Sequence, residues 1–198
     1  MPTLGLTKLN AVNRMLYAVN ERPVPSLTPG GSTIEADAER FLDDYNDVVQ
    51  TYGWPENTRF FEDITSDGTG IITVPSDTLK IWPSGRNEYR TIVLQSDQLV
   101  DQNNNTTNFG ANVMIQFDRV RRMGFENTSP SLKELILTTA MCYFQQRIRG
   151  SMTMDAMIQQ ERALAEMMAD RNQSRLARRP INLQPIIATM RGVQSERQ

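Results

Sequence analysis

Histidine does not occur anywhere in the 198-residue sequence. Its absence removes the commonest general base, the commonest metal ligand, and every nucleophile that a histidine would activate. Cysteine occurs once, as Cys142, so the chain cannot form an internal disulfide. A zinc site would have to rely on carboxylates and this single thiol. We therefore expect no metal site, no cofactor and no enzymatic activity.

Long apolar runs and a strong charge of either sign are also lacking. No apolar run approaches the roughly 20 residues that span a bilayer, and no basic segment followed by an apolar one marks a signal peptide. The net charge is -2, which by itself does not indicate a nucleic-acid partner. We expect a soluble protein that is made in a cytoplasm and does not contact a membrane.

Motifs with a recognised chemistry are missing as well. The sequence contains no phosphate-binding loop, no dinucleotide fingerprint and no nucleophile elbow. Acidic residues do cluster, at Asp43, Asp44 and Asp47 on one expected helix and at Asp63 and Asp67 beside a turn. A glycosidase needs only two carboxyl groups about 5–10 Å apart. A carbohydrate hydrolase with a carboxylate pair therefore stays open as an alternative.

The most informative stretch that is present is SPSLKELILTTAMCYFQQRIRG, residues 129–150. Ser129 suits the N-cap of a helix, and Pro130 suits its first position because proline has no N–H to leave unpaired. Apolar residues then recur at steps of three and four, the period of a helix face. Gly150 follows two arginines and is typical of a helix end. This pattern predicts a helix around which the rest of the chain is organised.

Three further helices are predicted. Residues 6–19 form one, with Thr7 as its cap, and residues 32–52 form another, where Ser32 and Glu35 have the spacing of a capping box. A loop rich in proline and glycine separates them. Residues 152–178 read as one long helix with Thr153 as a possible cap.

Between the second and third helices the apolar period changes from a helical one to that of short strands. The predicted strands, which turn sequences separate, are 70–74, 79–82, 91–94 and 113–117. The simplest fold is α+β, with a four-helix body, a small antiparallel β domain inserted between helices 2 and 3, and an extended C-terminal tail. The expected boundaries are 1–57 and 124–179 for the helical body, 58–123 for the β domain and 180–198 for the tail.

Three surfaces are candidates for binding. On the last helix, Met154, Met157, Leu164 and Met168 lie in a seam that also holds charged residues, so we expect it to contact a neighbouring subunit rather than a dry core. Arg119, Arg121 and Arg122 form a basic run, which is either a solvated or ion-paired surface or, repeated around a ring, the lining of a DNA channel. A further arginine cluster precedes the tail. The apolar, proline-punctuated tail is either a free terminus or a segment that orders on a partner.

The order and spacing of several motifs resemble the tail tubular protein A family, the head-to-tail adaptors of short-tailed bacteriophages. The resemblance covers roughly residues 6–179. The motifs that carry it are Leu9–Asn13, Glu21–Val24, Ala36–Leu42, Gly53–Trp54, Ile72–Pro75, Gly124–Glu126, Phe144–Arg147 and Gly150–Ser151.

This resemblance implies a structural protein of the virion, at the head-to-tail interface. It implies a dodecameric ring between the portal protein and the tail nozzle protein, with DNA passing through the lumen. In such adaptors the helical part and the tail engage the portal, and the β part faces the nozzle. The portal-binding residues would then be Arg178, Arg179, Pro180, Ile181, Leu183, Ile186 and Ile187.

Two other classes of function remain alongside the adaptor. One is the carbohydrate hydrolase, which requires two acids that face each other in a cleft. The other is a nucleic-acid-binding module, which requires a salt-dependent affinity of the single chain for DNA. The near-neutral net charge argues against strong DNA binding by a monomer.

Overall fold

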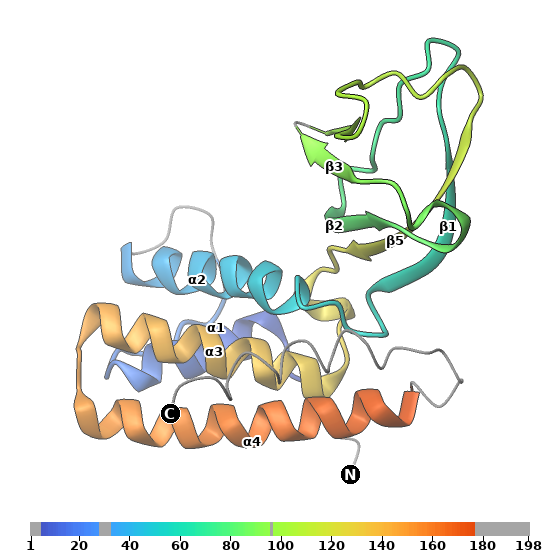
Figure 1. Cartoon of the computed structure of the whole chain (residues 1–198). Coiled ribbons are helices and arrows are strands. Elements are labelled where there is room, and N and C mark those ends of the chain that lie inside the picture. Colours follow the sequence, from blue (N-terminus) through green and yellow to red (C-terminus); the bar gives the residue numbers. More distant parts are fainter. Residues whose placement is uncertain (1–4, 28–32, 96, 177–198) are drawn as a thin grey trace, which may run out of the picture.

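Helices and strands occupy separate stretches of the chain, as the change in the spacing of apolar residues predicts. The computed structural model describes residues 5–27, 33–95 and 97–176. Within them, four helices form one body, and a small antiparallel β domain projects from one end of it (Figure 1). The strands lie in sequence between the second and third helices, which confirms the α+β prediction. The helices are α1 (Lys8–Ala18), α2 (Thr33–Gln50), α3 (Pro130–Ile148) and α4 (Met152–Leu176).

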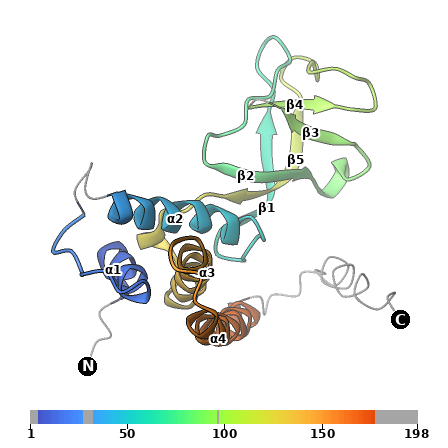
Figure 2. The same ribbon diagram turned by 90° about the vertical axis from the view of Figure 1, so that its left-hand side faces the viewer.

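Helix α3 is the centre of the helical body. The other three helices surround it, as the view along the helices shows (Figure 2). Ser129 is the N-cap residue and Pro130 follows it, as predicted, but the Ser129 hydroxyl makes no capping bond. Instead, the Glu56 carboxylate accepts the Ser129 N–H at 3.1 Å. Gly150 ends the helix at a φ of +61°, a conformation that favours glycine.

The core of the body combines buried apolar residues of α1, α2 and α3 with a narrow seam of α4. Thr7 caps α1 by accepting the N–H of Asn10 at 3.2 Å, as expected. Two aromatic side chains, Phe41 of α2 and Phe144 of α3, meet edge to face with ring centroids 5.6 Å apart. Large side chains that are completely buried in this core include Met15, Leu42, Leu132, Ile136, Leu137 and Phe144.

The β domain contains two sheets. Strand β5 (Met114–Arg121) is the centre of a three-stranded antiparallel sheet, between β1 (Thr58–Thr65) and β2 (Thr78–Pro83). Strands β3 (Ile92–Gln95) and β4 (Gln98–Asp101) form a separate hairpin. These strands enclose a second, smaller core of Ile72, Val74, Ile92, Leu99, Ile115 and Phe117.

The strand predictions were only partly right. The runs 79–82, 91–94 and 113–117 all fall on strands, and β5 continues beyond its predicted end. The run 70–74 is not a strand: within it only Thr73 makes an isolated bridge, to Gln98. Its apolar side chains still point inward and bury Ile72 and Val74. Strands β1 and β4 were not among the predicted runs.

Candidate interaction surfaces

Helix α4 has a narrow packed side and a broad exposed one. Its buried residues Ile158, Ala165 and Ala169 face α3, and their small size allows the two helices to approach closely. Met157, Leu164 and Met168 lie on one flank of this buried seam, and each is more than half exposed. We call these three residues the methionine face.

The methionine face borders the side of the body on which α1 packs. Beside Met168, the start of α3 and the second half of α4 line a groove of about 510 Å³. Glu134 of α3 is one of its residues, and this carboxylate also pairs with Arg14 of α1 at 2.9 Å. Met154 is different from the other members of the predicted seam because it is half-buried against the helical core.

Arg119 is buried inside the β domain instead of facing outward. It lies on β5 with the same strand parity as Ile115 and Phe117, so its side chain points to the core face and is only 6% exposed. Its Nε donates to Glu62 of β1 at 2.7 Å, and its Nη1 donates to Asp77 at 2.6 Å. Burial alone disfavours the charged guanidinium, but these two hydrogen-bonded carboxylates outweigh it and raise the pKa of Arg119. The position of Arg119 therefore does not support its predicted role in lining a channel.

We expect Arg119→Ala to destabilise the β domain by about 2 kcal/mol, because it removes a paired group that ties both edge strands to β5. The loss is moderate because Glu62 and Asp77 are partly exposed and can be hydrated. Urea denaturation measures the change. Arg119→Lys should recover part of it, since lysine keeps the charge but not the two-pronged geometry. Equal losses for both variants would contradict this account.

The other two residues of the basic run lie where the β domain joins the body. Arg122 is exposed and pairs with Asp47 of α2, with Nη2 to Oδ2 at 2.7 Å. Arg121 is half-buried, and its backbone N–H donates to the Asn57 carbonyl at 2.8 Å.

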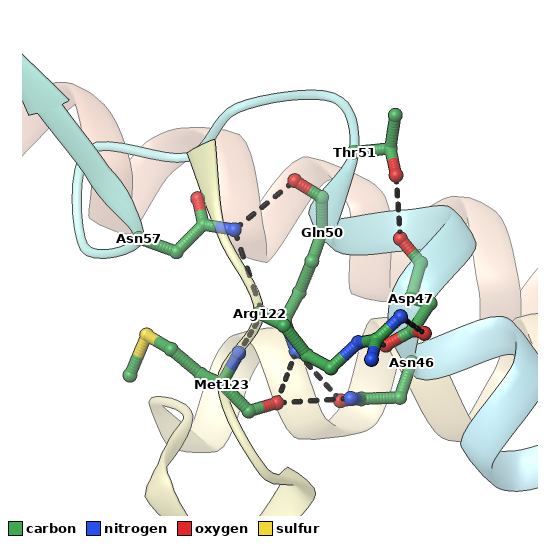
Figure 3. Close-up of polar contacts among 7 residues, drawn as sticks. All are labelled: Asn46, Asp47, Gln50, Thr51, Asn57, Arg122 and Met123. Carbon is green, nitrogen blue, oxygen red and sulfur yellow. Dashed lines mark hydrogen bonds and ion pairs between the residues drawn. The ribbon is translucent and has the colours of Figure 1, made fainter. Parts of the chain in front are cut away.

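A buried cluster of amides holds this junction together (Figure 3). Gln50, at the end of α2, is completely buried. Its Nε2 donates to the Met123 carbonyl at 2.7 Å, and its Oε1 accepts the Met123 N–H at 2.7 Å. Asn46 donates to the same carbonyl, and Asn57 donates to the carbonyls of Gln50 and Arg121. The two chain segments that connect body and β domain are thereby fastened to each other and to α2.

No periodic pattern in the sequence pointed to this cluster. Gln50 and Asn46 are four residues apart on one helix, but Met123 is 73 residues from Gln50 along the chain. The only available signal was the position of polar Asn46 and Gln50 near the apolar stripe of α2. Buried amides are satisfied by hydrogen bonds. Here most of the partners are backbone groups of Met123, which is distant in the sequence.

Three of the five acidic residues considered for a hydrolase have close structural partners. Asp43 pairs with Lys8 and Asp47 with Arg122. Asp67 organises a turn: hydrogen bonds from the Thr69 hydroxyl and from backbone N–H groups, including that of Ile71, lower its pKa. Among the described residues, no group of three or more acidic or thiol side chains is arranged to hold a metal ion.

The single thiol lies inside the helical body. Cys142 of α3 is buried against α4, where its sulfur is 2.8 Å from Gln159 Nε2. Burial raises the pKa of the Cys142 thiol, and the nearby Asp155 carboxylate raises it further. A thiol in this environment is a poor nucleophile at neutral pH.

Two predicted features lie outside the part of the chain that the structure describes. The proposed portal-binding residues, from Arg178 to Ile187, lie outside the described residues, as does Ser32 of the predicted capping box. In the part of the chain that is described, no helix combines the length and the apolar character that crossing a membrane requires.

Comparison with known proteins identifies the family. The family model for the tail tubular protein matches residues 9–177, which is most of the chain. No curated protein matches the sequence. The chain therefore belongs to the tail tubular protein family, which is structural, and it is a component of the phage tail in the virion.

Proposed function

We propose that this tail tubular protein is the head-to-tail adaptor of a short-tailed phage. It is made in the host cytoplasm and assembles as a dodecameric ring between the portal protein and the tail nozzle protein. DNA passes through the ring during ejection. The observation that carries this proposal is the methionine face, an apolar surface on a helix of 25 residues whose three side chains are each more than half exposed.

The exposed apolar side chains support assembly because soluble monomers rarely leave such surfaces uncovered. Methionine suits a surface that must adapt to a partner, since its side chain is unbranched and polarizable.

The division into two parts suits a protein that joins two different partners. The helical body and the tail of residues 180–198 would contact the portal, and the β domain, which projects from the body (Figure 1), would contact the nozzle. The buried amide cluster at the junction would hold the two binding parts at a fixed separation.

Arg121 and Arg122 would contact DNA transiently in the channel, whereas Arg119 would not. A channel wall must attract phosphates weakly, so that the DNA still slides. Arg122 is exposed, and its ion pair with Asp47 reduces the charge that it presents to the lumen.

The mass of the purified chain, alone and mixed with its portal protein, tests the proposal. Native mass spectrometry or light scattering should find a large stoichiometric ring in the mixture. Removal of residues 180–198 should weaken binding to the portal without unfolding the helical body. A compact monomer that never associates with the portal would overturn the adaptor function.

Leu164→Asp should raise the concentration needed for ring assembly by about tenfold or more, because it buries a charge in an apolar contact. The matched control is Ala163→Asp, an exposed position that points about 100° around α4 from Leu164 and lies outside the methionine face. Sedimentation or native mass spectrometry compares the two variants. Equal assembly of both would show that the methionine face is not a subunit contact.

A further inference from the structure

A second apolar surface lies on the other side of the helical body. Tyr45, Val48 and Tyr52 of α2 and Tyr143 of α3 form it, and we call it the tyrosine face. Val48, Tyr52 and Tyr143 are between 42% and 70% exposed. The rings of Tyr45 and Tyr143 stack with centroids 4.7 Å apart and planes inclined by 10°, which makes this face flat and rigid.

The tyrosine face and the methionine face flank α4 from opposite sides. Tyr143 of the tyrosine face follows Cys142, which contacts Asp155 and Gln159 of α4. These α4 residues lie on the flank opposite the methionine face, because their positions on the helix differ from those of Leu164 and Met168 by roughly half a turn. Helix α1 packs on the methionine side of α3 only (Figure 2).

The two faces also match in spacing and direction. Tyr45, Val48 and Tyr52 follow one another at steps of three and four residues. Glu161, Leu164 and Met168 follow the same two steps on the flank of α4. Helices α2 and α4 run in the same direction (Figure 1), and Tyr45 stacks on Tyr143, which follows the Cys142 that contacts Gln159, so the two series overlap in height along the body. A rotation about a ring axis roughly parallel to these helices would bring Val48 opposite Leu164 and Tyr52 opposite Met168.

The side chains on the two faces are of the kinds that fill subunit interfaces. Tyrosine, methionine and arginine are enriched in the centres of such interfaces, whereas lysine, glutamate and aspartate are depleted there. The exposed Arg147, whose guanidinium lies 5.5 Å over the Phe41 ring, borders the tyrosine face. Glu161 is exposed on the flank of the methionine face and supplies an opposite charge.

We infer that the tyrosine face of one subunit binds the methionine face of the next copy of the same chain. The contact is head-to-tail: each subunit presents one face to each neighbour, as a closed ring requires. Flat, rigid tyrosines meet adaptable methionines, so the contact can close without changing either backbone. This inference rests on the proposed ring and names the two surfaces that form it.

Cysteine cross-linking in the assembled full-length chain tests the pairing. Val48→Cys and Leu164→Cys are combined in one chain and treated with a short bismaleimide; Cys142 is buried, and the parent chain controls for it. The double variant should give a ladder of covalent oligomers on a denaturing gel. Mixing the two single variants should give covalent dimers and nothing larger. Each single variant alone should give no cross-link.

The matched control is Val48→Cys with Ala163→Cys, which points the second thiol about 100° around α4 from Leu164, outside the methionine face, and should cross-link far less. Native mass spectrometry on the same samples separates the two proposals. Rings of normal mass without the Val48–Leu164 cross-link overturn the face pairing and leave the adaptor function standing. Dimers from a single variant alone show a two-fold contact and also overturn it. A chain that stays monomeric with and without its portal overturns both.

Discussion

Phe117→Ala is expected to unfold the β domain and leave the helical body folded. Phe117 of β5 is completely buried and is the largest side chain in a core of only six buried residues. Truncating such a phenylalanine costs about 3–5 kcal/mol, from lost burial and from the cavity left behind. A core in a unit of fewer than about 70 residues rarely supplies more than that. The substitution therefore removes most or all of the stability of the domain.

The helical body should survive because its core is separate. The buried residues around α3 and those around β5 form two clusters that share no member. Hydrogen exchange with mass spectrometry would show fast exchange throughout residues 58–121 and unchanged protection of α1, α2 and α3. Limited proteolysis should cut the same region. Met114→Ala, on the exposed face of the same strand, is the control and should change stability by less than about 0.5 kcal/mol.

One result would contradict this prediction. If the helices lose protection together with the strands, body and β domain unfold as a single cooperative unit. The amide cluster at the junction would then transmit stability between them, and the two cores would not be independent.

The helices could be predicted from the sequence because their signals are local. Pro130 and Gly150 mark the two ends of α3 within a few residues of the actual helix, and Thr7 caps α1 as expected. The exposed flank of α4 was also visible, because Met157, Leu164 and Met168 repeat at a helical period among charged residues. The helical period could not show which side of α4 packs against α3. That side consists of Ile158, Ala165 and Ala169.

The β domain was harder because strands depend on distant partners. Strand β1 was missed because its apolar residues do not alternate: Phe60 and Phe61 are adjacent. A bulge between Arg59 and Glu62 leaves Phe61, at a φ of +55°, half exposed. The run 70–74 has strand-like residues, but it makes no ladder.

Arg119 shows the same limit for a predicted site. Its parity with Ile115 and Phe117 indicated an inward side chain, but the acids that make its burial possible are 57 and 42 residues away in the sequence. Sequence proximity to Arg121 and Arg122 suggested a shared surface. Arg122 lies beyond the end of β5, however, and ion-pair partners are not periodic. The partners of a strand and of its charged side chains must therefore be known before a run of charged residues can be assigned to one surface.

Gln50→Ala should destabilise the chain by about 3 kcal/mol and loosen the attachment of the β domain. The substitution leaves the buried Met123 N–H without the oxygen that accepts it at 2.7 Å, and it removes one of the two donors to the Met123 carbonyl. An unsatisfied buried donor costs about 1–3 kcal/mol, and the lost hydrogen bonds and packing of a completely buried side chain add to it. Urea denaturation measures the total change in the free energy of unfolding.

The control is Thr51→Ala, one residue further along. Its hydroxyl donates only to the Asp47 carbonyl within the same turn, and its side chain is exposed, so the change should be less than about 0.5 kcal/mol. Gln50→Glu is a sharper test than alanine. A carboxylate has no donor for the Met123 carbonyl and the Asn46 amide oxygen, so charge and oxygen atoms would face each other in a buried site.

The geometry of the junction should change before the helices unfold. Asn57 and Met123 belong to the two connecting segments, and Gln50 contacts both, so without it the β domain can swing relative to α2. Fluorescence energy transfer between a dye on the body and a dye on the β domain should report a broader distance distribution for Gln50→Ala than for Thr51→Ala. The proposed adaptor ring needs all its β domains at one height, so under that proposal ring assembly should persist while binding of the proposed nozzle partner weakens. A narrow, unchanged distance distribution in Gln50→Ala would show that the remaining bonds of Asn46, Asn57 and Arg122 are sufficient to fix the domain.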